Sequence, residues 1–74
     1  MRELYAFYEI SLFGRPCVVF VPRKNEEIAS GALVKHFKQL QAKWTGVCIY
    51  ARTTISSSNR RRLIEHRVPF VTRP

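Results

Sequence analysis

Two short runs of consecutive apolar residues stand out in the hydrophobic pattern of the chain. The first covers residues 17–21 and ends at Pro22, and the second covers residues 47–51. Short, continuous apolar runs rich in β-branched residues are typical of buried strands in parallel or mixed sheets. Each run is therefore predicted to be a buried strand, and the first is expected to be covered on both faces.

An amphipathic helix is predicted between these strands. Its apolar residues recur at i, i+4, i+7 and i+11: Leu33, Phe37, Leu40 and Trp44. Asn25 can cap this helix, and the carboxylates of Glu26 and Glu27 would suit its positive end. Ser30-Gly31 is expected to delay the regular helix by a turn, and Gly46 is expected to end it.

A second helix and a third strand are predicted after a polar loop over residues 52–58. Ser57 or Ser58 is expected to cap a short helix that runs through His66. Residues 68–71 are then predicted to be a strand. Because Pro69 lacks an N–H group, it must stand at the start of this strand or on a sheet edge.

Residues 2–13 fit two structures. Leu4, Tyr8 and Leu12 recur at helical spacing and Gly14 follows them, which favours a helix. The segment is also rich in aromatic and β-branched residues. The alternative is therefore the first strand of a hairpin that turns at residues 14–16.

The predicted fold class is α/β: a small sheet of three or more largely parallel strands flanked by helices, in the order (α or β)-β-α-β-α-β. Strands that alternate with helices at this spacing imply right-handed parallel crossovers. A chain of 74 residues is long enough for one domain, over residues 1–74. We expect this domain to be a fragment of a longer chain.

Positive charge is the strongest compositional signal. The chain has 13 Lys and Arg against five acidic residues, all Glu, for a net charge of +8. Residues 38–74 alone carry eight basic residues and one acidic residue. Such asymmetry favours DNA or another polyanion as partner, although a charged face without any anionic partner is the competing interpretation.

The expected anion-binding residues lie at the carboxyl ends of the predicted strands and at the start of the second helix. Ligands bind at the carboxyl ends of strands in open parallel sheets, and helix starts offer free N–H groups. Three arginines in a first helical turn also oppose the helix dipole, which a bound anion would relieve. The candidate residues are Arg23, Lys24, Arg52, Ser57, Ser58, Arg60, Arg61 and Arg62.

Catalytic and metal-binding patterns are weak. The chain lacks Asp, the commonest ligand in metal-dependent nuclease sites, and it has no glycine-rich phosphate loop. Cys17 and Cys48 are expected to be reduced core thiols, and Trp44 and Tyr50 are expected to pack in the core. We predict no enzymatic activity, no cofactor and no metal.

Residues 62–71, together with residues 12–16 before a Val-rich strand, resemble the N-terminal region of uncharacterised bacterial regulators with a MarR-type winged-helix domain further along. The resemblance implies an accessory or regulatory domain of a DNA-binding transcriptional regulator. Its basic face would contact phosphates or a partner domain, with self-association or a C-terminal domain of the same protein as further contacts. The alternatives are a small enzyme or nuclease-like fragment with its site at the strand ends, and a protein–protein interaction module.

The N-terminus lacks the pattern of a secretory signal, and no apolar stretch approaches the ~20 residues that span a bilayer. A cytoplasmic location with no membrane partner is therefore expected.

Overall fold

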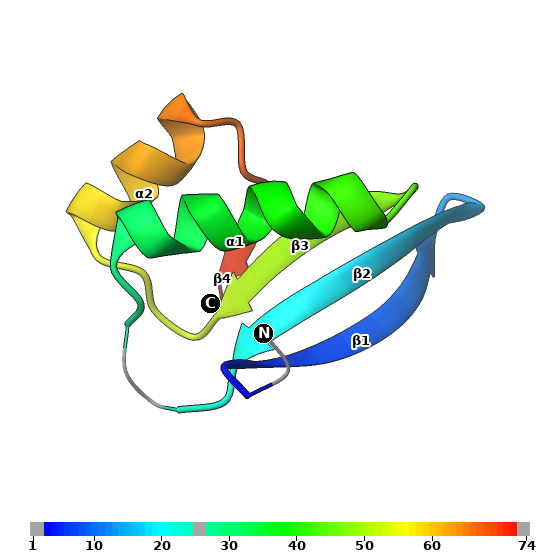
Figure 1. Ribbon diagram of the computed structural model, residues 1–74, viewed down its shortest axis with the longest axis horizontal. Helices are drawn as coiled ribbons and strands as arrows, with labels where there is room; N and C mark the ends of the chain where they lie inside the picture. Colours follow the sequence, from blue (N-terminus) through cyan, green and yellow to red (C-terminus); the bar gives the residue numbers. More distant parts are fainter. Residues whose placement is uncertain (1–2, 25–26, 73–74) are drawn as a thin grey trace.

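The computed structural model describes residues 3–24 and 27–72, and it has four strands and two helices (Figure 1). Their order and bounds are β1 Tyr5–Leu12, β2 Arg15–Pro22, α1 Ser30–Lys43, β3 Val47–Arg52, α2 Ser57–Glu65 and β4 Phe70–Thr72. The two apolar runs form the central strands β2 and β3, as predicted. Asn25 and Glu26, expected at a helix start, lie outside the described residues.

The sheet is mixed, with the strand order β1-β2-β3-β4. β2 pairs with β3, and β3 with β4, in parallel, whereas β1 and β2 are antiparallel. The predicted α/β class is confirmed. Pro69 immediately precedes β4, which is the edge strand beyond β3, so the expected position of this proline is confirmed as well.

The slight preference for a helix at the N-terminus was wrong, because residues 5–12 form β1. All eight of its residues pair with β2, from Tyr5 opposite Pro22 to Leu12 opposite Arg15. A lone helix of about this length is marginal in water, whereas the strand saturates the free edge of β2 and buries Tyr5 in the core. Helical spacing at three positions could not reveal this long-range pairing.

The hairpin turns one residue earlier than expected, at Phe13-Gly14. Both residues have positive φ angles, 53° and 77°, as in a type I′ turn. Such a turn matches the twist of the flanking strands and prefers Asn-Gly, so Phe13 adopts a conformation that its Cβ disfavours. The Phe13 ring is also fully exposed.

Both helices lie on the same side of the sheet (Figure 1). Parallel crossovers are almost always right-handed, and the two connections cross the sheet in the same direction, from β2 to β3 and on to β4. They therefore place α1 and α2 on one face. The core fills the space between this face and the helices, and its fully buried large side chains are Tyr5, Phe20, Leu33, Cys48, Tyr50 and Leu63.

The opposite side of the sheet has no helix over it, and we call it the bare face. It consists of every second strand residue, counted from Ala6 on β1, Arg15 on β2, Val47 on β3 and Val71 on β4. Side chains alternate between the two sides along a strand, and paired residues on neighbouring strands point to the same side. None of these residues belongs to the core cluster beneath the helices. Of residues 17–21, Cys17 is buried on this side, but Val19 and Val21 stay partly accessible, so the expectation that the run is covered on both faces is wrong for these two residues.

Local interactions fix the ends of α2. The cap is Ser56, and not Ser57 or Ser58 as predicted from the sequence. Its hydroxyl accepts a hydrogen bond from the backbone N–H of Asn59, at 3.4 Å. At the other end, Arg67 has a φ of 56°, and the N–H groups of Arg67 and Val68 donate to the carbonyls of Ile64 and Leu63. This Schellman motif ends the helix with arginine where glycine is usual.

Candidate anion-binding edge

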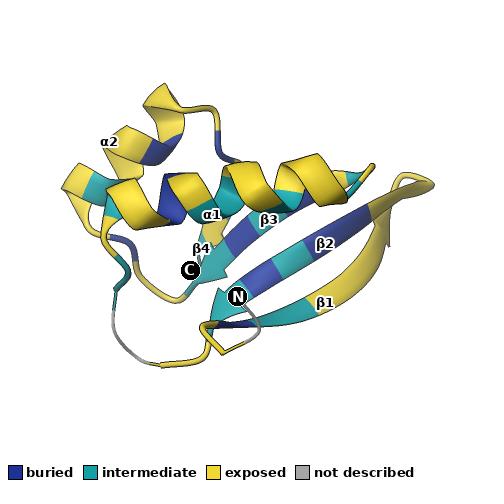
Figure 2. Cartoon of the chain, in the orientation of Figure 1, coloured by how far each residue is buried: buried dark blue, intermediate teal, exposed yellow. Residues whose placement is uncertain are grey.

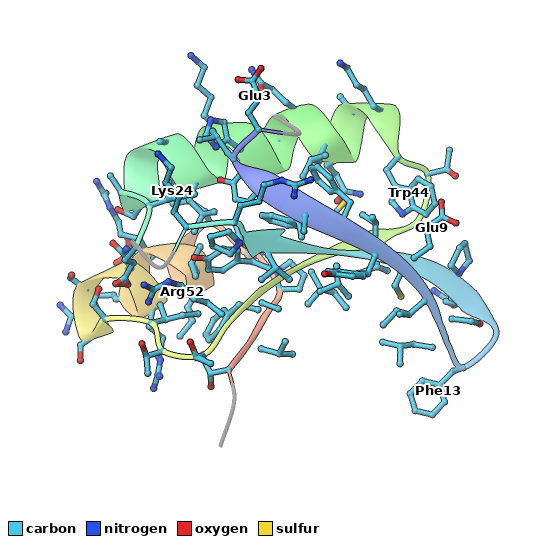
Figure 3. All side chains as sticks on the ribbon, turned by 90° about the horizontal axis from the view of Figure 1, so that it is seen from below. Glu3, Glu9, Phe13, Lys24, Trp44 and Arg52 are labelled. Carbon is cyan, nitrogen blue, oxygen red and sulfur yellow. The ribbon has the colours of Figure 1, made fainter. Side chains whose placement is uncertain are left out.

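Three of the predicted basic residues come together at the carboxyl ends of β2 and β3. Arg23, Lys24 and Arg52, which we call the basic edge, line a hollow of about 240 Å³ together with Val21, Pro22 and Thr53. Lys24 and Arg52 lie at the end of the sheet opposite to Phe13 (Figure 3). This is the place where open parallel sheets bind ligands.

Backbone contacts position two of these side chains. Arg23 donates from Nε to the carbonyl oxygen of Tyr5 at 3.1 Å, and its own N–H donates to the carbonyl of Leu4 at 2.8 Å. The Arg52 guanidinium donates to the carbonyl oxygen of Thr54. Arg23 thus holds the start of β1 against the end of β2, while Arg52 orders the loop before α2.

A carboxylate of the chain itself occupies the entry to α2. The two carboxylate oxygens of Glu27 accept from the backbone N–H of Ser56, at 2.7 and 3.2 Å. Partial burial raises the pKa of Glu27, but hydrogen bonds from Ser56 and Asn59 and the charge of Arg52 outweigh it and leave that pKa below its ordinary value. Glu27, expected at the start of α1, therefore serves the start of α2.

The two serines at the start of α2 are exposed. The Ser58 hydroxyl lies 3.5 Å from the Ser56 hydroxyl, within hydrogen-bond distance. Since Glu27 already occupies this helix entry, Ser57 and Ser58 offer an external anion little uncompensated positive charge.

The three consecutive arginines of α2 are all exposed. Neighbouring helical residues are about 100° apart, so these side chains fan over the solvent side of α2 around the buried Leu63. Within residues 3–24 and 27–72, the side chains of Arg60, Arg61 and Arg62 have no hydrogen-bond or ion-pair partner. Their charge is therefore available to a ligand.

The basic edge offers charge and hydroxyl groups. The described residues that line its hollow include no carboxylate, imidazole or thiol. Nor do the described parts of the chain contain a group of three or more side chains that could hold a metal ion. No helix within them is long and apolar enough to cross a membrane.

Sequence reasoning missed one polar contact in the interior. The Tyr5 hydroxyl and Nδ1 of His36 share a hydrogen bond of 2.7 Å between β1 and α1. Burial raises the pKa of Tyr5 and lowers that of His36 from its ordinary value of 6.5. The position of His36, next to the apolar stripe of α1, was the available signal, but it gave no indication of Tyr5 as partner.

The remaining predictions about side chains concern the core. Tyr50 is fully buried and Trp44 packs partly buried against the core, as predicted. Cys17 and Cys48 are buried free thiols, and burial raises the pKa of Cys48. Only Cys48 is part of the core beneath the helices, because Cys17 lies on the bare face.

Comparison of the chain with protein-family models, with curated proteins and with solved structures gives no match. The resemblance to the N-terminal region of MarR-type regulators therefore stays a prediction.

Proposed function

We propose that this domain is a non-enzymatic module that binds the phosphate backbone of a nucleic acid through α2 and the basic edge. One observation carries the proposal: the guanidinium groups of Arg60, Arg61 and Arg62 are on exposed residues and have no partner among the described residues. Their helix begins beside the end of the sheet where Arg23, Lys24 and Arg52 lie, because Glu27, just after β2, contacts the α2 entry at Ser56.

Phosphate is the ligand that this chemistry suits. Guanidinium groups donate in pairs to phosphate oxygens, and an extended polyanion can contact a fan of arginines that no small ligand would span. Contacts to the backbone also need no fixed array of side chains that reads base edges. A regulatory or accessory part in a DNA-binding regulator, as the sequence resemblance implies, is consistent with such binding.

The test measures how salt affects binding to a 20-base-pair duplex DNA of random sequence, by fluorescence anisotropy. Each phosphate contact contributes about 0.9 to the slope of log affinity against log salt. In the triple variant Arg60→Glu, Arg61→Glu and Arg62→Glu, we therefore expect the slope to fall by about 3 and the affinity to fall at least tenfold.

The matched control reverses the three lysines of α1: Lys35→Glu, Lys38→Glu and Lys43→Glu. All three lysines are exposed, as the arginines are. Their reversal changes the net charge of the protein by the same amount, but on the neighbouring helix. The proposal expects a smaller loss for this control. Equal losses of DNA affinity in the two variants would mean that only the net charge of the protein matters. Wild-type protein that does not bind the duplex at low salt would refute the proposal.

A further inference from the structure

The bare face is almost wholly apolar. Arg15, at the hairpin end, is its only charged residue. Among the described residues, eight large apolar side chains are exposed, and five of these lie on this face: Tyr8, Ile10, Leu12, Val47 and Val71. Figure 2 shows the resulting exposure along the outer half of β1. Soluble monomers rarely expose a contiguous apolar patch of this kind.

The sequence of the central strands also indicates a second covering layer. β2 and β3 carry continuous apolar runs, a pattern found in strands that are buried on both faces, whereas one-sided sheets alternate apolar and polar residues. Val19, Val21 and Ile49 are nevertheless only partly buried in the single chain. Cys17 is already buried on this face, and a partner over the bare face would account for the apolar character of the other three positions.

The total surface of the chain agrees with a missing contact. Its accessible surface is 5491 Å², whereas a folded monomer of 8.7 kDa is expected to expose about 4,700 Å². The difference is roughly 800 Å², which is about the area that one partner buries in a protein–protein interface of standard size.

We propose that the bare face packs against the bare face of a second copy of this chain. Sheets pack face to face with about 10 Å between them, and a two-fold axis makes one apolar patch its own complement. The basic helices would then point outwards on both sides. Because two sheets separate them, the like charges lie further apart than the Debye length of about 8 Å at physiological salt.

The test is the mass of the wild-type protein by sedimentation equilibrium between 1 µM and 1 mM. We expect a concentration-dependent rise from 8.7 kDa to twice that mass. In the double variant Tyr8→Lys and Val71→Lys, the dimer dissociation constant should rise at least a hundredfold, because four uncompensated charges would enter the apolar interface. Both side chains are about half exposed, at 58% and 52%, so the variant is expected to keep the fold.

The control is Ile64→Lys, which places the same charge on an apolar residue that is 63% exposed on α2. It should leave the dissociation constant within twofold of wild type. Wild-type protein that stays at 8.7 kDa at 1 mM would overturn the proposal. So would a dimer that the double variant leaves intact, since the contact would then be elsewhere, for example along the free edge of β1.

This proposal does not depend on phosphate binding. The arginines of α2 lie on the opposite side of the sheet from the bare face, so a loss of DNA binding in the α2 variant and a loss of dimer in the bare-face variant are separate outcomes.

Discussion

The two sides of the sheet differ in how the same kind of residue is used. Beneath the helices, Phe20 and Tyr50 face each other across β2 and β3 and are fully buried. On the opposite side, their neighbours Val19 and Ile49 pair in the same way but stay partly accessible. Hydrophobicity in the sequence does not distinguish these two sides; the direction of the crossovers does.

The charges follow the same division. The two helices carry three lysines and three arginines against a single acid, Glu65, while the bare face has only Arg15. One side of the domain therefore suits a polyanion and the other an apolar partner. Both kinds of contact are compatible in one molecule because the sheet lies between them.

The largest effect is expected from a matched pair of substitutions in β2. Val18 lies under the helices and is 8% exposed, while Val19 lies on the bare face. In urea unfolding of the protein at low concentration, Val18→Ala should lower the free energy of unfolding by about 2 kcal/mol. Val19→Ala should lower it by less than about 1 kcal/mol.

Raising the protein concentration should narrow this difference, because a second copy would bury Val19 and make its truncation more costly. Equal losses of stability for both variants in dilute solution would show that Val18 and Val19 do not differ in burial.

The next effect concerns the hairpin turn, which tests backbone strain apart from burial. Phe13→Asn gives the Asn-Gly pair that a type I′ turn prefers and should raise the free energy of unfolding by about 1 kcal/mol, measured by thermal or urea unfolding. Phe13→Ala removes the ring but keeps a disfavoured residue at positive φ, so it should give no such gain. A loss of stability in Phe13→Asn would mean that the exposed ring contributes to the fold.

The smallest effect is a pH dependence that belongs to the helix side alone. The pKa of His36 is lowered in the fold, so the unfolded chain takes up more protons as the pH falls. The stabilisation is present above about pH 6.5 and is lost as the pH falls through the folded pKa. Urea unfolding at several pH values should show this slope in the wild type and a weaker slope in His36→Gln.

Local patterns predicted the elements whose signals are local. The two apolar runs became β2 and β3, the stripe from Leu33 to Trp44 became α1 and its C-cap, and Pro69 marked the start of an edge strand. The ends of α2 were right to within two residues, because a serine cap is a local feature.

Features that depend on distant residues could not be predicted. The strand at residues 5–12 exists because β2 offers an edge, and Glu27 meets Ser56 across 29 residues of sequence. For the candidate site, sequence placed Arg23, Lys24 and Arg52 at one edge through the rule for strand ends. It did not indicate that a glutamate of the chain would occupy the start of α2.

The most direct test of the second copy on the bare face is an isotope-filtered nuclear Overhauser experiment on an equal mixture of ¹³C-labelled and unlabelled protein at about 1 mM. Intermolecular signals are expected at the methyl groups of Val19, Val21 and Ile49, and none at those of Leu33 and Leu63 beneath the helices. Intermolecular signals confined to other residues, or none at all, would contradict the assignment of the bare face as the contact between two copies.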